Sequence, residues 1–350
     1  MTDKTKSREE SVAIQFAEMM VEKLESINSN WKKPWFCETS LAWPRNMNFR
    51  EYNGGNALML MMQCEKKCYK LPIFCTFDRM IGLNYTTDKQ GAKQPITDAD
   101  GVKLPHVGVN KGERGFPVYI TTYTCVNAET KERIKYDDFI KMSEEDRSKF
   151  NTYPKLQVYS VFNIDQTNMK EARPELYKKL EEQVLGTIPS TPKEDMFAFP
   201  VVDHMIEHNE WICPIKPTHG DDAYYSISQK EIVVPEKEQF NDGESFYSNL
   251  FHEMSHSTGA EEYLNRLKPT SFGSKEYARE ELVAELTAAL VSQRYGMSKT
   301  VKEDSLPYLK SWLERLKEEP QFIKTVLTDV MKSSRIITRK IDELTEQAKN

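Results

Sequence analysis

Two histidines one helical turn apart, with a glutamate directly after the first, are the residues of this chain best suited to chemistry. They stand in the segment His252-Glu253-Met254-Ser255-His256. In an α-helix, residues i and i+4 emerge on the same face, so both imidazoles can bind one metal ion. The pattern is typical of zinc-dependent hydrolases, in which the glutamate takes a proton from a metal-activated water. We therefore predict His252 and His256 as metal ligands and Glu253 as the catalytic base.

The residues around this motif predict a short and largely buried helix. Asp242 lies in a turn-forming cluster and can cap the helix start, and Gly259 stands where a helix would stop. Between them Phe246, Leu250 and Phe251 repeat at mixed spacings, as expected of a helix buried on most of its girth. The histidines would occupy its last two turns, where rigid ligands meet few competing waters.

A catalytic zinc site needs a third protein ligand and leaves its fourth position open. Candidates stand on a second predicted helix, residues 277–286, in which Glu281 and Glu285 share one face beside an apolar stripe. Carboxylates in that position are costly to bury unless a cation compensates them. Glu280 competes with Glu281 for the ligand role. Without the histidines, an ordinary amphipathic helix with solvated glutamates would explain the pattern.

An HExxH motif followed, after a gap of just over twenty residues, by a Glu-x-x-x-Glu pair resembles the glutamate zincins, a group of metallopeptidases. In that group the first acid binds zinc and the second orients a histidine. The resemblance implies that Glu281 is the third ligand, that Glu285 supports a histidine, and that one Zn²⁺ binds per chain. A hydrogen-bond donor to the transition state is also expected. Its candidates, left open, are Tyr225, Tyr263 and Tyr277.

Composition sets the broad class of the protein. The 350 residues are 39% apolar and 29% charged, as in a globular protein long enough for two domains. No run of 18 apolar residues predicts a membrane span, and the amino terminus lacks the apolar stretch of a signal peptide. Six cysteines are too few for a disulfide scaffold. We expect reduced thiols, a cytoplasmic location and no membrane partner.

The net charge of −6 conceals an asymmetry along the chain. Residues 23–125 hold 14 Lys/Arg against 9 Asp/Glu, which suggests an anionic partner for the amino-terminal part. Single-stranded nucleic acid is bound by aromatic platforms for the bases and by cations for the phosphates. Both kinds of residue interleave here, although the tryptophans could instead anchor a core. The candidate DNA-binding residues are Trp31, Lys32, Lys33, Trp35, Trp43, Arg45, Arg50, Lys111 and Arg114.

The order of predicted elements indicates an α+β chain with two domains. A mixed α/β domain spans residues 1–168, with a polar insertion at 126–155 that carries short helices. A helix and linker follow at 169–193, and residues 194–350 form a mostly helical domain with a small sheet. Strands are expected at 73–77, 116–120 and 158–163, and a hairpin at 224–234.

Motifs along nearly the whole chain resemble the ArdC-type antirestriction proteins of plasmids, phages and other mobile genetic elements. The most specific are His252-Glu253-x-x-His256-x-x-Gly259 and Tyr277-Ala278-Arg279-Glu280-Glu281-Leu282-Val283-Ala284-Glu285, and a weaker one is Tyr52-x-Gly54-Gly55-Asn56. The resemblance implies an amino-terminal domain that binds single-stranded DNA and a zincin-like metallopeptidase domain with an unknown protein substrate. The alternative is a DNA-binding protective protein whose zinc domain is a non-catalytic scaffold.

Overall fold

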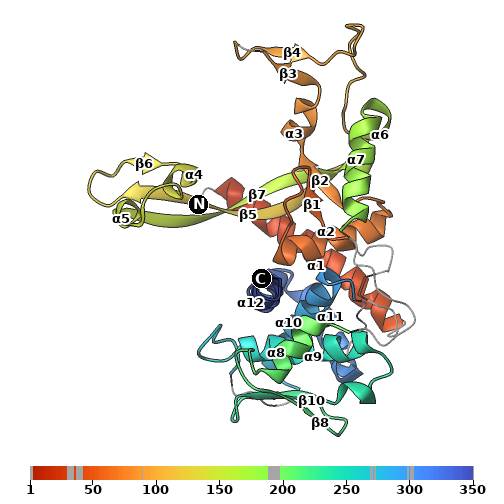
Figure 1. Cartoon of the computed structure of the whole chain (residues 1–350), viewed down its shortest axis with the longest axis vertical. Coiled ribbons are helices and arrows are strands. Elements are labelled where there is room, and N and C mark those ends of the chain that lie inside the picture. The colour runs from red at the N-terminus through yellow and green to blue at the C-terminus, as the bar shows by residue number, and fades with distance from the viewer. Residues whose placement is uncertain are drawn as a thin grey trace. The chain divides into compact units, whose positions relative to one another are not determined.

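The chain folds into two compact units (Figure 1). The computed structural model describes residues 3–29, 35–36, 42–88, 90–187, 198–268, 271, 273–297, 299 and 303–349. Unit 1 comprises Met1–Glu9 and Phe74–Ala172, and unit 2 comprises Glu10–Ile73 and Arg173–Asn350. Both contain helices and sheets, so the fold is α+β, as predicted. None of the described helices combines the length and the apolar character that crossing a membrane requires.

A long antiparallel ribbon dominates unit 1. Its strands are β5 (Phe116–Asn127) and β7 (Phe150–Asn163), which pair over their length from Phe116 opposite Val161 to Asn127 opposite Phe150. Strand β2 (Ile73–Thr76) pairs with β7, and β6 (Arg133–Ile134) pairs with β5. Figure 1 shows β5 and β7 side by side, with the short helices α4 (Tyr136–Phe139) and α5 (Glu144–Arg147) at the end of the ribbon.

The ribbon is longer than the sequence predicted. The expected strands, 116–120 and 158–163, are only the part nearest β2; pairing continues into the expected insertion, 126–155. The short helices predicted there are confirmed, and the Ser143 hydroxyl caps α5 by accepting from Asp146 N at 3.1 Å. Threonine and tyrosine favour strands even where no apolar run marks them, because the pleated backbone suits their shape.

Gln166, which follows β7, holds a turn beside the ribbon. The Gln166 side chain donates to the Glu113 carboxylate and to the Arg114 carbonyl oxygen, both at 2.9 Å. These contacts fix the turn of residues 111–115 near the end of β7. The other elements are α3 (Phe77–Gly82), β3 (Tyr85–Thr87), β4 (Lys93–Pro95), η2 (Ile164–Gln166) and α6 (Met169–Ala172).

Unit 2 is mostly helical and holds a three-stranded sheet. The sheet has the order β8-β10-β9, with β10 (Glu231–Pro235) parallel to β8 (Ile215–Thr218) and antiparallel to β9 (Tyr224–Ser226). The predicted hairpin at 224–234 is therefore confirmed. The helices are α1 (Asp3–Ser29, in unit 2 from Glu10), α2 (Gly54–Lys67), α7 (Pro174–Leu185), α8 (Pro200–Glu207), η3 (Lys237–Gln239), α9 (Gly243–Thr258), α10 (Lys275–Arg294), η4 (Glu303–Tyr308), α11 (Leu309–Glu318) and α12 (Phe322–Gln347), and β1 is Arg45–Asn46.

Helices from both ends of the sequence share the packing of unit 2. Helix α9 packs against α10, and α12 packs against both and against α2. Gly54 permits the last contact, because a Cβ atom there would lie 2.5 Å from Met331 Cβ and its φ of +55° suits glycine. Residues 10–73, grouped with the amino-terminal domain from sequence, thus pack with the carboxy-terminal helices. The predicted domain boundaries, 1–168, 169–193 and 194–350, stay a prediction.

Candidate metal centre

Helix α9 carries the HExxH motif into the interior of unit 2. Asp242 caps its start by accepting a hydrogen bond from Ser245 N at 2.6 Å, and the helix ends before Gly259, as predicted. Most of its residues are buried. His252 is 1% exposed and Glu253 2% exposed, so few solvent molecules compete for their polar atoms.

Helix α10 supplies buried carboxylates opposite the motif. Its start is capped by Ser274, whose hydroxyl accepts from Tyr277 N at 3.1 Å. The helix packs along α9, and its buried residues include Glu281 and Glu285, the latter 0% exposed. Because burying a charged carboxylate without a partner is costly, each of these side chains must be compensated by groups from neighbouring segments.

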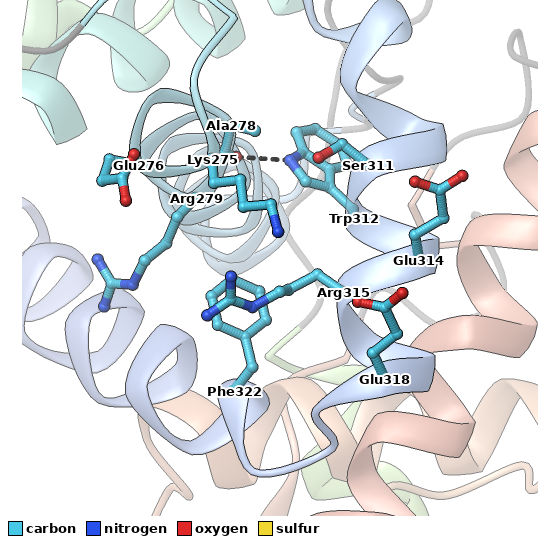
Figure 2. A pocket seen from close by; sticks show the side chains of 10 residues that line it. All are labelled: Lys275, Glu276, Ala278, Arg279, Ser311, Trp312, Glu314, Arg315, Glu318 and Phe322. Atoms are coloured by element: carbon cyan, nitrogen blue, oxygen red, sulfur yellow. Dashed lines mark hydrogen bonds between the residues drawn. The ribbon is translucent and has the colours of Figure 1, made fainter.

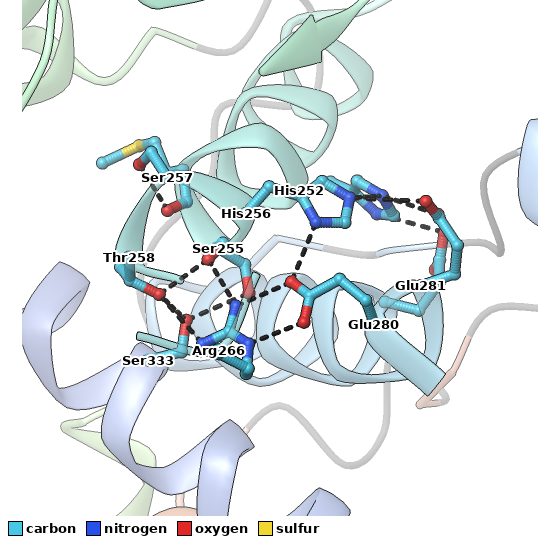
Figure 3. Close-up of polar contacts among 11 residues, drawn as sticks. His252, Ser255, His256, Ser257, Thr258, Arg266, Glu280, Glu281 and Ser333 are labelled. Carbon is cyan, nitrogen blue, oxygen red and sulfur yellow. Dashed lines mark hydrogen bonds and ion pairs between the residues drawn. The ribbon is translucent and has the colours of Figure 1, made fainter. Parts of the chain in front are cut away.

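Three potential ligand atoms converge between α9 and α10 (Figure 3). The Nε2 atoms of His252 and His256 lie 3.1 Å apart. Glu281 places one oxygen 3.3 Å from His252 Nε2 and the other 3.6 Å from His256 Nε2. One ligand atom from each residue lies within 4.8 Å of the others. Two ligands about 2 Å from a tetrahedral ion would be roughly 3.3 Å apart, so these separations fit one metal ion.

The hydrogen-bonding partners of the histidines also favour a cation. Nδ1 of His256 faces Glu280 at 3.0 Å, and Nδ1 of His252 faces Glu285 at 3.3 Å. The His256 contact is a hydrogen bond and the His252 contact an ion pair, and an ionised carboxylate only accepts hydrogen bonds. In neutral rings that carry their proton on the Nδ1 facing the carboxylate, each Nε2 has a lone pair. Two lone pairs and the Glu281 carboxylate then point at one another. A metal ion satisfies all three.

Glu280, the rival for the ligand role, faces away from the Nε2 atoms. It accepts from Arg266 Nε at 2.7 Å and from Arg266 Nη2 at 2.8 Å, and it contacts His256 from behind. Burial opposes its ionisation, but Arg266 and His256 outweigh that effect and lower the pKa of Glu280. The structure thus brings Glu281 to the ligand cluster and places Glu280 where it supports a histidine.

Glu285 supports the other histidine and has a buried cation behind it. Lys299 Nζ lies 3.3 Å from Glu285 Oε2, and the lysine side chain is 3% exposed. Sequence reasoning identified neither Lys299 nor Arg266, because both lie in connections outside the two predicted helices. The number of acids was an available signal: Glu253, Glu280, Glu281 and Glu285 carry more negative charge than one divalent ion balances.

Tyr277 is the candidate tyrosine that the structure places beside the cluster. Burial of Glu281 would raise its pKa, but when both histidines are protonated their charges, together with hydrogen bonds from His252 and Tyr277, lower it to about 2. Burial, together with the negative charges of Glu281 and Glu253, raises the pKa of the Tyr277 phenol. Tyr277 therefore keeps its proton at neutral pH and can donate a hydrogen bond in the site.

The other two tyrosine candidates have no described contact with the ligand cluster. Tyr263 is 47% exposed, and its hydroxyl donates to the Ile212 carbonyl oxygen at 3.2 Å. Tyr225 is half-buried against the core of unit 2, and burial is the main cause that raises its pKa. Of the three, Tyr277 alone contacts a member of the ligand cluster through a described interaction.

A separate hollow of about 180 Å³ adjoins α10 but contains none of the site residues (Figure 2). Arg279 contributes to it and lies two residues before Glu281, about 200° around the helix. Two of its charged residues pair with neighbours: Arg279 with Asp329 at 2.5 Å and Arg315 with Glu319 at 2.8 Å. Trp312 Nε1 donates to the Ala278 carbonyl oxygen at 2.5 Å. This hollow therefore serves packing in our interpretation.

The candidate DNA-binding residues do not form one cluster. Trp35 is 0% exposed and Trp43 8% exposed, so neither indole offers the open face that base stacking needs. Arg45 pairs with Glu51 at 2.7 Å, whereas Arg50 is exposed. Lys111 and Arg114 are exposed on their turn in unit 1. Trp31, Lys32 and Lys33 lie outside the described residues.

Comparison with known families assigns both halves of the chain. Residues 202–327 match a family described as zincin-like metallopeptidases. Residues 10–162 match the N-terminal domain of the anti-restriction factor ArdC. The first match contains α9 and α10 with every residue of the ligand cluster.

Curated relatives share most of this chain. The DNA primase TraC of Escherichia coli is 28% identical over 323 residues, which cover 90% of this chain and 19% of the primase. The uncharacterized protein y4eC of Sinorhizobium fredii (strain NBRC 101917 / NGR234) is 26% identical over 327 residues, which cover 93% of this chain and 90% of that protein. The chain thus spans about a fifth of the length of the primase.

Solved structures share the fold. The antirestriction ArdC protein from plasmid R388 matches with a TM-score of 0.60 in its metal-free form, at 22% identity and over 94% of this chain and 98% of that one. Its Mn(II)-bound form matches with a TM-score of 0.61, at 21% identity and over 93% and 97% of the two chains. Fold and site define a zincin-like domain joined to an ArdC-type amino-terminal domain. The chain has the domain composition of the ArdC-like antirestriction family, which confirms the resemblance expected from its sequence.

Proposed function

We propose that this chain is an antirestriction protein of a mobile genetic element that binds one zinc ion and hydrolyses peptide bonds in a protein substrate. The convergence of His252, His256 and Glu281 carries the proposal. These atoms are two imidazole nitrogens and a carboxylate, a ligand set typical of catalytic zinc. The zincin-like family match supports the same conclusion.

The residues around the cluster have distinct roles in the proposed reaction. When bound, zinc would make water more acidic and polarise the scissile carbonyl. Glu253 takes the proton of the attacking water and passes it to the leaving amine nitrogen. Tyr277 keeps its proton and donates a hydrogen bond, so it is the transition-state donor we favour. The buried position of Glu253 keeps competing water from its carboxylate.

Metal analysis of purified protein tests the ligand assignment. We expect about one zinc ion per wild-type chain after dialysis against a slight excess of zinc, and none above background for His252→Ala. Arg279→Met is the matched control, because Arg279 lies on α10 but outside the cluster, and it should retain zinc. A wild-type chain that takes up no zinc contradicts the proposal.

We propose further that the amino-terminal half binds single-stranded DNA through one face of the ribbon. The register of β5 and β7 puts Ile120, Tyr153 and Tyr159 on one face, and they are 40%, 56% and 39% exposed. Exposed tyrosines can stack on bases in any sequence. Lys111 and Arg114 stand on the turn near the end of β7, where Gln166 donates to the Arg114 carbonyl oxygen at 2.9 Å. They supply charge for phosphates.

A gel-shift series tests DNA binding independently of the metal. We expect tighter binding to a single-stranded oligonucleotide than to the duplex of the same sequence, with affinity falling as salt rises. The metal-free His252→Ala protein should bind as wild type does. Equal or absent binding to both DNAs contradicts this half of the proposal.

Protection in cells separates the peptidase from its alternative, a DNA-binding shield. A plasmid encoding wild-type protein should raise the survival of unmodified incoming DNA in a restricting host. If Glu253→Gln protects as well as wild type, the zinc domain is a scaffold and occupancy of the DNA suffices. The five described cysteines are free, and we propose that the protein acts in the cytoplasm.

A further inference from the structure

Each histidine of the cluster is backed by a carboxylate, and each of these carboxylates is contacted by a buried cation. Behind His256 stand Glu280 and Arg266, joined by two hydrogen bonds of 2.7 and 2.8 Å. Behind His252 stand Glu285 and Lys299, whose charged atoms are 3.3 Å apart. The side chains of Arg266 and Lys299 are 4% and 3% exposed. Two buried chains of the same chemistry, histidine to glutamate to cation, therefore support one cluster (Figure 3 shows the first).

Charge explains why such cations are needed. A divalent ion with Glu281 leaves one positive charge, and ionised Glu253 balances it. The carboxylates of Glu280 and Glu285 would then remain as uncompensated buried charges, which proteins tolerate only with a close partner. Arg266 and Lys299 are the partners that the described structure supplies.

We propose that Arg266 and Lys299 are positioning residues of the metal centre. This inference rests on the proposed metal site. By holding Glu280 and Glu285 in place as acceptors, the two cations keep the proton of each histidine on Nδ1 and leave Nε2 open toward the metal. Supporting carboxylates raise the metal affinity of a histidine because they fix its tautomer and ring orientation. Arg266 and Lys299 would act on these supporting carboxylates rather than on the histidines themselves.

The two cations come from connections rather than from α9 or α10. Arg266 follows α9 and also donates to the Ser255 carbonyl oxygen at 2.8 Å, which fastens it to the helix that carries the histidines. Lys299 follows α10, and its carbonyl oxygen accepts from Trp35 N at 2.7 Å. The connections after both helices thus contribute to the cluster, so changes in them should alter metal binding without touching a ligand.

Metal affinity of the full chain tests the inference. Zinc and Mn(II) dissociation constants would be measured by calorimetry with a competing chelator for wild type, Lys299→Gln, Arg266→Gln and Arg279→Gln. We expect affinity about 10- to 100-fold weaker for the first two variants. Lys299→Arg and Arg266→Lys should recover part of the loss. Arg279 lies on the face of α10 opposite the cluster and pairs with Asp329 of α12. Arg279→Gln should therefore bind metal as wild type does.

A second measurement separates positioning from a general loss of structure. Ring ¹⁵N shifts of the metal-free protein report which nitrogen carries the proton, and we expect His252 to shift toward a mixture of tautomers in Lys299→Gln only. In a double-mutant cycle, Lys299→Gln should add little to the loss of metal affinity that Glu285→Gln causes, because the lysine acts through the Glu285 carboxylate. The Glu285→Gln/Lys299→Gln pair leaves neither charge uncompensated, so it stays measurable if Lys299→Gln does not fold.

The outcomes are distinguishable. Wild-type protein that binds neither metal overturns the proposed function itself. Wild-type protein that binds metal, with Lys299→Gln and Arg266→Gln binding equally well, overturns only the positioning role. Additive losses of affinity in the Glu285 and Lys299 cycle would likewise overturn it, since they show that lysine acts independently of Glu285.

Discussion

The metal cluster of unit 2 and the ribbon of unit 1 differ in the burial of the side chains that could bind a partner. Between α9 and α10 the charged groups are buried, and His252, His256 and Glu281 have supporting contacts. On the ribbon, Tyr153 and Tyr159 stand exposed, 56% and 39%, on two strands that pair mainly with each other. The charged groups of the cluster are thus enclosed by protein, whereas the tyrosine rings of the ribbon face solvent.

This difference indicates two kinds of partner. Buried polar groups in a low-dielectric interior are stabilising only when every member is satisfied, so the cluster suits a small ion held in a fixed geometry. Exposed aromatic rings stay in contact with solvent after folding, and they become buried only when a partner binds over them. A flexible strand of nucleic acid can provide that surface along the ribbon. The two regions should therefore respond separately to mutation.

The largest effect is expected from Glu253→Gln. The amide cannot accept a proton, so peptide hydrolysis should fall about 10²- to 10⁴-fold while zinc content stays at the wild-type level. Cleavage of a fluorescently labelled unfolded protein, with zinc measured on the same samples, checks this. DNA binding should not change. Full cleavage by a metal-loaded variant would remove the peptidase assignment and leave the scaffold alternative.

Zinc binding should stabilise the metal cluster of unit 2 and leave the stability of the ribbon of unit 1 unchanged. At a free concentration 100 times its dissociation constant, a ligand that binds only the native state adds about 2.7 kcal/mol to the free energy of unfolding. Hydrogen exchange should show the gain in the amides of α9 and α10, with β5 and β7 unchanged. Protection that rises equally in the ribbon would show that the two regions are coupled. His252→Ala, which lacks a ligand, should show no gain in either.

Tyr153→Ala should weaken binding of single-stranded DNA. Loss of one stacked ring costs about 1–3 kcal/mol, or roughly 5- to 150-fold in affinity. Stability should change by less than about 0.5 kcal/mol, because the side chain is exposed. Tyr224→Ala is the matched control in unit 2, where the tyrosine is 45% exposed. Fluorescence anisotropy of a labelled oligonucleotide measures both. Equal losses of DNA affinity in the two variants would show that the ribbon is not the DNA-binding surface.

The smallest effect is expected from Lys111→Ala. Removing one phosphate contact should lower the slope of log affinity against log salt by about 0.7 and reduce affinity a few-fold at low salt. Lys310→Ala, which alters an exposed lysine of α11, should leave the slope unchanged. A titration over several salt concentrations distinguishes the two. An unchanged slope for Lys111→Ala would place the phosphate contacts elsewhere on the chain.

Local patterns predicted the helices of the site well. Asp242 and Gly259 mark the ends of α9 in sequence and in the structure, because caps and stops depend on residues within one turn. The ribbon was predicted short, since its outer residues are polar and its pairing joins segments more than twenty residues apart. The sequence left open whether Trp35 and Trp43 are buried, because an aromatic residue serves a core and a binding surface alike.

By itself the sequence determined the metal-binding pattern: two histidines four residues apart and a glutamate beside the first, all on one short helix. It also determined that acids follow on a second helix. Only the tertiary structure decided that Glu281 joins the cluster while Glu280 turns to Arg266, and that Lys299 stands behind Glu285. The physical reason is range. Helical periodicity fixes which side chains share a face, but the compensation of buried charge depends on connections that approach only when the helices pack.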